Sequence, residues 1–123
     1  MTTATPAIIR HNMQANFADA VEVGGLVFLR GVTAPDPGQD VAGQTGRILA
    51  QIDGLLARSQ CTRAGLVSAT IYMVDIDQRE SMNRVWSAWI DRANVPVRAT
   101  VGVAALGSPD TLIEISAIAA RVR

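Results

Sequence analysis

Lysine is absent from this chain, and all eleven of its basic residues are arginine. A catalytic lysine that forms a Schiff base with a carbonyl substrate is therefore excluded. The chain has a single histidine, His11, and a single cysteine, Cys61, so we expect neither a His/Cys metal site within one subunit nor an intrachain disulfide. Any chemistry falls to arginine, carboxylates, hydroxyl groups and the backbone.

An excess of charge of either sign is also missing. Eleven acidic residues balance the eleven arginines, and no run of basic residues occurs. The electrostatic footprint of a nucleic-acid or anionic-membrane partner is therefore absent. The apolar runs are far shorter than a bilayer span, and residues 1–12 lack the layout of a signal peptide. These absences predict a soluble, cytoplasmic protein with no membrane partner.

Apolar residues, by contrast, are plentiful. They make up 49% of the 123 residues, against 18% charged residues. The length predicts one domain over residues 1–123, and a domain this small leaves much of its surface uncovered by its own core. The apolar excess therefore favours burial against copies of the same chain.

The first half of the chain predicts strands followed by a helix. Residues 1–12 are expected to be mobile or to form an edge strand. Two β-rich runs, 20–23 and 26–29, flank a Gly-Gly pair and indicate a hairpin. Prolines and glycines predict a surface loop over 32–44. From Thr45, apolar residues recur at helical spacing: Ile48, Leu49, Ile52, Leu55 and Leu56.

The second half predicts a strand, a helix and two more strands. Residues 66–74 carry apolar side chains on both alternating faces, which is typical of a central strand covered on both sides. Asp77 and Glu80 resemble a capping box that starts a second helix. Its apolar stripe comprises Met82, Val85, Trp86, Trp89 and Ile90. Strands are expected over 98–106 and 111–119.

The resulting order, β-β-β-α-β-α-β-β, predicts an α+β fold in which both helices cover one face of a sheet of about six strands. No element is left to cover the other face. We therefore expect another subunit to cover it.

Five segments, taken in order, resemble the RidA/YjgF family, also called the L-PSP endoribonuclease family. Residues 17–21 (FADAV) and 24–31 (GGLVFLRG) are similar to the family's Tyr-Ser-Gln-Ala-Val and Gly-Asp-Leu-Val-Phe-Val-Ser-Gly. The strand 69–75 (ATIYMVD) also fits. Residues 95–101 (VPVRATV) are similar to Pro-Ala-Arg-Ser/Ala-x-Val, and 112–115 (LIEI) to Val/Ile-Glu-Ile.

The resemblance implies a chorismate-mutase-like fold with a mixed sheet, a homotrimer and clefts between subunits. It implies hydrolysis of reactive enamines and 2-imino acids, such as 2-iminobutanoate and 2-iminopropanoate, to 2-oxo acids and ammonia. It also implies that neither a metal nor an organic cofactor takes part. The expected partners are two further copies of the chain and a small carboxylate-bearing metabolite.

Two catalytic residues follow from the resemblance. Arg98, just after a Pro-containing turn, would hold the substrate carboxylate with its guanidinium fork. Without the resemblance, a surface ion pair is the simpler interpretation of this arginine. Glu114 lies in the middle of a predicted strand, where an unpaired buried carboxylate would be costly. It either faces solvent or, as the resemblance implies, orients the hydrolytic water.

Three further residues are expected to bind substrate. Phe17 stands where the family usually has tyrosine, so its ring can form a wall but the hydroxyl is missing. Thr100 occupies a place near the substrate, although ordinary strand packing is the simpler role for it. Arg30 replaces a common serine, and it either adds a second cation to the cleft or pairs across the subunit interface.

Three functions remain open on these residues. An imine or enamine hydrolase is the leading one. The departures at Phe17 and Arg30 favour a non-catalytic binding trimer, a sensor or chaperone-like protein, whereas Glu114 argues against it. An endoribonuclease or translation inhibitor is the weakest, because the net charge is zero and aromatic residues make up 4% of the chain. Cys61 is read as structural, and Trp86 and Trp89 as core or interface.

Overall fold

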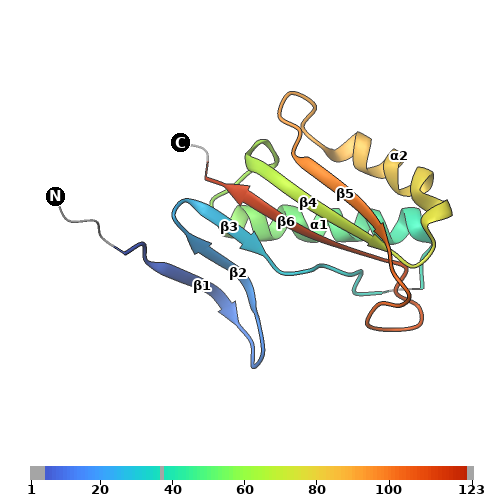
Figure 1. Ribbon diagram of the computed structural model, residues 1–123, viewed down its shortest axis with the longest axis horizontal. Helices are drawn as coiled ribbons and strands as arrows, with labels where there is room; N and C mark the ends of the chain where they lie inside the picture. Colours follow the sequence, from blue (N-terminus) through green and yellow to red (C-terminus); the bar gives the residue numbers. More distant parts are fainter. Residues whose placement is uncertain (1–4, 37, 122–123) are drawn as a thin grey trace.

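The computed structural model describes residues 5–36 and 38–121, which form one six-stranded sheet with two α-helices (Figure 1). The strands are β1 (Ile8–Met13), β2 (Ala18–Val23), β3 (Leu26–Leu29), β4 (Leu66–Met73), β5 (Val97–Gly102) and β6 (Ile113–Ala120). The helices are α1 (Val41–Arg58) and α2 (Arg79–Trp89). A short 3-10 turn, η1 (Arg63–Gly65), follows α1, and a second, η2 (Ile76–Gln78), precedes α2. This order of strands and α-helices confirms the predicted one.

The sheet is mixed, with strand order β1-β2-β3-β6-β4-β5. Only β4 and β5 pair in parallel, because the connection that carries α2 returns the chain to the same end of the sheet. The other neighbouring strands are antiparallel. Strand β1 lies at one edge, as expected for part of residues 1–12, and β5 lies at the other; residues 1–4 fall outside the described residues.

The β2–β3 hairpin is confirmed, and its turn explains the glycine pair. Gly24 and Gly25 have φ angles of +59° and +80°. Two successive left-handed residues make the type I′ turn whose twist matches that of the flanking strands. Glycine adopts this conformation without the steric penalty that a Cβ brings.

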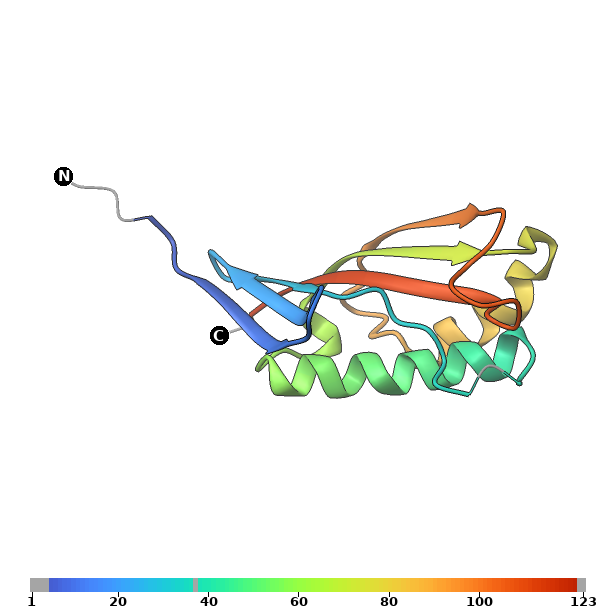
Figure 2. The same ribbon diagram turned by 90° about the horizontal axis from the view of Figure 1, so that it is seen from below.

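Both helices lie on one face of the sheet, with α1 running beneath it and α2 beside α1 (Figure 2). The predicted apolar stripe of α1 is buried. It packs against the inward-facing residues of the central strands, including Ile71, Ile113 and Ile115, none of which is exposed. Met82, Trp86 and Ile90 of the second predicted stripe join the same core. The sequence therefore predicted the core correctly.

The beginnings of both helices differ from expectation. Helix α1 begins at Val41 rather than Thr45, because the Asp40 carboxylate accepts a hydrogen bond of 2.8 Å from the Gly43 backbone N–H and caps the first turn. The proposed cap at Asp77 is wrong. Asp75 caps the turn η2, and α2 follows from Arg79 without a side-chain cap.

The last two strands are also displaced. Strand β5 ends at Gly102 rather than 106, because its one neighbour, β4, ends at Met73 and offers no further backbone partner after the bond from Val103 N–H. Strand β6 begins two residues later than expected and ends at Ala120. Neither described helix combines the length and hydropathy that a bilayer crossing requires.

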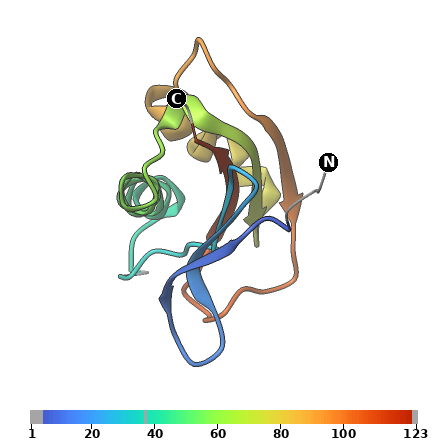
Figure 3. The same ribbon diagram turned by 90° about the vertical axis from the view of Figure 1, so that its left-hand side faces the viewer.

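The sheet face opposite the helices carries no layer from the described residues (Figures 2 and 3). Alternation along the strands places Phe28, Thr70, Glu114 and Ser116 on this open face, while their neighbours face the helices. Phe28 is 39% exposed there. We expected β4 to be covered on both of its faces. Within a single chain, the helices cover only one of them.

Candidate functional site

An open pocket of about 480 Å³ lies beside the junction of β2, β3 and β6. Its lining residues are Phe17, Ala18, Arg30, Gly31, Thr33 and Glu114. Three of the five site residues expected from the sequence, namely Phe17, Arg30 and Glu114, therefore come together around one space. The other two, Arg98 and Thr100, do not line it.

The carboxylate of Glu114 reaches the pocket because of a bulge in the neighbouring strand. Phe28 pairs with Ile118, and four residues later Val32 pairs with Ile115, only three residues back along β6. The extra residue turns Gly31 toward Glu114. A Cβ built on Gly31 would overlap the Glu114 carboxylate, with its Cδ at 3.1 Å. Glycine at this position therefore lets the Glu114 carboxylate approach the backbone this closely.

Arg30 is held by its own chain. Its Nε donates to Asp19 Oδ1 at 3.0 Å, and its terminal nitrogens donate to the Gly31 carbonyl at 3.2 Å and to Gln51 Oε1 at 3.5 Å. The guanidinium of this pocket residue is thus neither an unpaired cation nor dependent on another subunit for a partner.

Asp19 is the anion of this network. Asn12 donates a hydrogen bond of 2.7 Å to its second oxygen. That bond lowers the pKa of Asp19 most; burial opposes it, and the hydrogen bond and charge of Arg30 add to the lowering, so the pKa lies below its ordinary value. Asp19 therefore stays ionised and compensates the charge of Arg30.

Phe17 forms an exposed wall. It ends the turn between β1 and β2, where its carbonyl accepts a 2.7 Å hydrogen bond from the Gln14 N–H. Its side chain is 56% exposed. A ring held at the rim of a pocket and left open to solvent can stack on a ligand without rearrangement.

Arg98 and Thr100 lie on the edge strand β5, on the other side of the sheet. They pair with Ala69 and Ile71, whose buried side chains face the helices, so Arg98 and Thr100 share that face. Glu114 points to the open face and lies two strands away, a backbone separation of about 10 Å at the usual strand spacing. Within one chain, the two expected catalytic side chains therefore do not meet.

The sequence did not identify the surroundings of Arg98. The guanidinium carbon lies 5.4 Å from the centre of the Trp86 ring. Arg98 also borders a shallow pocket of about 220 Å³ between β4 and β5. The helical stripe located Trp86 in the core, but the spacing of Trp86 and Arg98 in the sequence carries no signal of their contact.

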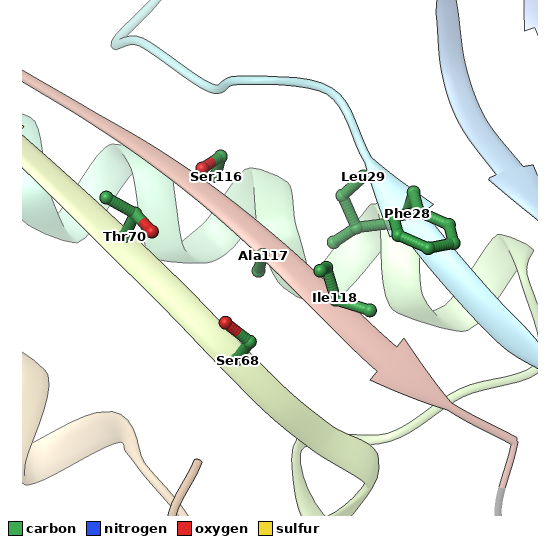
Figure 4. Close-up of a pocket in the computed structure, with 7 residues that line it drawn as sticks. All are labelled: Phe28, Leu29, Ser68, Thr70, Ser116, Ala117 and Ile118. Atoms are coloured by element: carbon green, nitrogen blue, oxygen red, sulfur yellow. The ribbon is translucent and has the colours of Figure 1, made fainter. Parts of the chain in front are cut away.

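The open face has a hollow of its own, also about 220 Å³ (Figure 4). Hydroxyl groups of Ser68, Thr70 and Ser116 alternate there with the apolar Phe28 and Ile118. None of the five expected site residues lines it. Its mixed lining is typical of surfaces between protein subunits rather than of a closed ligand cavity.

The two reactive residue types present only once are occupied or buried. Burial raises the pKa of the Cys61 thiol; the charge of Glu22 adds to the rise, while that of Arg121 opposes it. A neutral, buried thiol is a poor nucleophile, which supports a structural role. The Nε2 atom of His11 lies 3.7 Å from Glu22 Oε2 on the neighbouring strand, and His11 does not line the pocket at Glu114.

Comparisons with known proteins agree with this fold. The family model described as "Endoribonuclease L-PSP" matches residues 9–121. The RutC family protein YoaB of Escherichia coli K12 is 33% identical over 113 residues, which cover 92% of this chain and 97% of that protein. A RutC family protein of Haemophilus ducreyi is 30% identical, with coverage of 92% and 96%.

Solved structures give the same result. A member of the YjgF protein family from Neisseria meningitidis superimposes with a TM-score of 0.91 at 33% identity, covering 95% of this chain and 97% of that one. A YjgF/YER057c/UK114 family member from Mycobacterium tuberculosis has a TM-score of 0.81 at 29% identity, with coverage of 94% and 99%. The family match, the relatives and the fold all lead to one conclusion: this chain belongs to the RutC/YjgF (L-PSP) family.

Proposed function

We propose that the protein hydrolyses reactive enamines and 2-imino acids to 2-oxo acids and ammonia, in clefts between copies of the chain in a homotrimer. The observation that carries the proposal is the position of Glu114. Its half-buried carboxylate faces an open pocket against Gly31 and has no hydrogen-bond donor among the described residues. A carboxylate left free in this way can accept a proton or a hydrogen bond from a water molecule.

The chemistry requires little from the protein. Water adds to the carbon of the protonated imine, the C=N bond becomes a C–N single bond, and one proton of the water passes to Glu114. Glu114 then returns this proton to the nitrogen of the carbinolamine. As the carbinolamine hydroxyl loses its proton to solvent, the C=O bond of the 2-oxo acid forms, the C–N bond breaks and ammonia leaves. Because 2-imino acids already hydrolyse in water, holding substrate and water in reacting geometry accounts for the acceleration.

A second copy of the chain completes the site. Arg98, which would hold the substrate carboxylate, and Glu114 lie on opposite faces of the sheet and are separated by β4. A small substrate cannot touch both within one subunit. We therefore infer that Arg98 and Thr100 of one copy face the Glu114 pocket of the next. Exposed apolar side chains on β5, such as Val97 at 72%, support such a contact.

Ammonia and 2-oxo acid release test the proposal. The 2-imino acids are generated in situ by an amino-acid oxidase from a panel of amino acids, and wild type is compared with Arg98→Ala and Glu114→Gln. We expect acceleration by wild type and at least a tenfold loss in each variant. Arg47→Ala, which removes an exposed arginine on the solvent side of α1, serves as the matched control.

A binding trimer without turnover is the second candidate. The absent hydroxyl at Phe17 and the engagement of Arg30 by Asp19 favour it, because both remove groups that could act on a substrate. Binding of 2-oxobutanoate that depends on Arg98, without acceleration of any imine in the panel, would support this candidate over the hydrolase.

A further inference from the structure

The guanidinium of Arg98 rests on an aromatic ring, and no carboxylate of the described residues pairs with it. Its carbon lies 5.4 Å from the centroid of Trp86, within the range of a cation–π interaction. Within residues 5–36 and 38–121, the Arg98 guanidinium makes no hydrogen bond and no ion pair with another residue, although the backbone of Arg98 pairs with β4. The contact with Trp86 is therefore the one described interaction that orients this charge.

The ring beneath Arg98 is itself fixed. Trp86 is 7% exposed in the core, so its position is set by packing. Its neighbour Trp89 lies 5.6 Å away between ring centroids. Trp89 is anchored in turn, because its Nε1 donates to Asp53 Oδ2 at 3.1 Å. The support of Arg98 thus reaches helix α1.

Arg63 closes this arrangement. It donates two hydrogen bonds of 2.8 Å to the two oxygens of Asp53 and a third of 2.8 Å to the Trp89 carbonyl, while its guanidinium carbon lies 4.9 Å from the Trp89 ring centroid. Two arginines and two tryptophans therefore form one continuous row of contacts along α2, in the order Arg63, Trp89, Trp86 and Arg98, in which the two indole rings are tilted by 51° to each other.

The two arginines at the ends of this row differ in one respect. The charge of Arg63 is compensated by Asp53, as that of Arg30 is by Asp19 and that of Arg121 by Glu22. A neutral ring holds Arg98 without compensating its charge. Its donors at the edge of the guanidinium plane remain available for an incoming carboxylate.

We propose that Trp86 is a positioning residue that holds Arg98 ready for the substrate carboxylate, and that its π face, rather than its bulk, performs this role. The inference rests on the proposed function, since it deepens the part assigned to Arg98. Reduced side-chain freedom in the unbound protein lowers the entropic loss when the carboxylate binds. Substitution by a non-aromatic side chain therefore weakens carboxylate binding.

The matched pair Trp86→Phe and Trp86→Leu separates the π face from packing. Both remove bulk from the same core position, and only phenylalanine keeps a ring. Titration calorimetry with 2-oxobutanoate should show the affinity order wild type, Phe, Leu, with a loss in the Leu variant of roughly three- to thirtyfold, the range of cation–π energies. Thermal unfolding and circular dichroism establish that each variant is folded. Equal affinities in the two folded variants would overturn the inference.

Trp86 fluorescence provides a second readout that keeps the test open if the Leu variant fails to fold. The chain has two tryptophans, so Trp89→Phe leaves Trp86 as the single indole emitter. Addition of 2-oxobutanoate should change its emission, and Arg98→Ala in the same background should abolish the change. A change that persists without Arg98 contradicts the inference.

The imine assay is run on the same proteins, so that the two proposals fail separately. If wild type turns over imines and the Trp86→Phe and Trp86→Leu variants bind the carboxylate equally well, the role of Trp86 is overturned and the hydrolase proposal is supported. Carboxylate binding in the predicted order without turnover supports Trp86 and overturns the hydrolase. Absence of both binding and turnover in wild type overturns both.

Discussion

The Glu114 carboxylate occupies the space that a side chain on Gly31 would need. Gly31→Ala should therefore displace the carboxylate from its present position while leaving the backbone able to adopt its native conformation. A shift of about 1 Å in a catalytic group can reduce the rate a hundredfold, so we expect imine turnover to fall by roughly ten- to a hundredfold. Steady-state kinetics on the best substrate of the panel measure this effect.

Gly46→Ala is the control for that substitution. Gly46 lies on the exposed side of α1, where a Cβ would meet nothing within 4 Å. The Gly46→Ala substitution should leave turnover unchanged and stabilise the protein by about 1 kcal/mol, which is the difference in helix propensity between glycine and alanine. Unchanged turnover in Gly31→Ala would mean that the precise position of Glu114 does not matter for the reaction.

Removing the charge of Asp19 should alter ligand preference. In Asp19→Asn the guanidinium of Arg30 loses its compensating anion and keeps its place in the pocket. A ligand with two carboxylates gains from the uncompensated charge. We expect the affinity for 2-oxoglutarate to rise severalfold relative to that for 2-oxobutanoate, as measured by calorimetry. The double variant Asp19→Asn/Arg30→Ala should lose this gain in affinity for 2-oxoglutarate. If Asp19→Asn alone has the same ratio of 2-oxoglutarate affinity to 2-oxobutanoate affinity as wild type, the prediction is wrong.

Asp53 should make stability depend on acid pH. Burial raises the pKa of Asp53, but the hydrogen bonds from Arg63 and Trp89 and the charge of Arg63 outweigh it, so the pKa lies below the ordinary 3.8. Because the pKa of Asp53 is lower in the folded than in the unfolded protein, Asp53 stabilises the fold at pH values above its unfolded-state pKa. This stabilisation is lost as the pH falls through the folded-state pKa. The side chain is 36% exposed, and solvent screening limits the effect at pH 7 to about 1 kcal/mol or less.

Urea unfolding of wild type and Asp53→Asn at a fixed protein concentration tests this. The variant should be less stable at pH 7, and the difference should shrink between about pH 5 and pH 2 as Asp53 of the wild type takes up its proton. Asp77→Asn, an exposed site on η2, controls for the change in net charge. A difference that is constant over the whole range would argue against an ionised Asp53 as its source.

The description of the family model names an endoribonuclease, and RNA binding is open to a direct test. Equal numbers of acidic and basic residues provide no general attraction for phosphate. We expect the protein not to cleave single-stranded RNA. We also expect it to show no salt-dependent binding to RNA at 150 mM salt. Fluorescence anisotropy with a labelled oligonucleotide measures the binding. Salt-dependent affinity would revive the nucleic-acid function.

Local patterns predicted the framework of this protein well. The Gly-Gly pair located the hairpin, and the 3.6-residue period located both helix faces, because these features depend on neighbours in sequence. The start of α1 was missed, although Asp40 is an N-cap residue three positions before Gly43. The prolines and glycines of 32–44 concealed this signal, since such residues also occur in first helical turns.

Long-range contacts could not be predicted in this way. Gln44 joins α1 to the segment before β6 through hydrogen bonds with Asp110 and Leu112, 66 and 68 residues away. The end of β5 depends on the length of β4, and the partner of Arg30 depends on the pairing of β2 with β3. The family resemblance supplied the list of site residues, but the faces on which Arg98 and Glu114 lie required the sheet register.

The separation of Arg98 and Glu114 on opposite faces has a consequence for mixed assemblies. If a site takes Arg98 from one copy and Glu114 from the next, then two inactive proteins, Arg98→Ala and Glu114→Gln, can repair each other. Random mixing of equal amounts in a ring of three would restore about a quarter of the sites, since half of the copies donate each intact residue. In a cell with both alleles, the two defects would complement, although neither gene encodes an active protein.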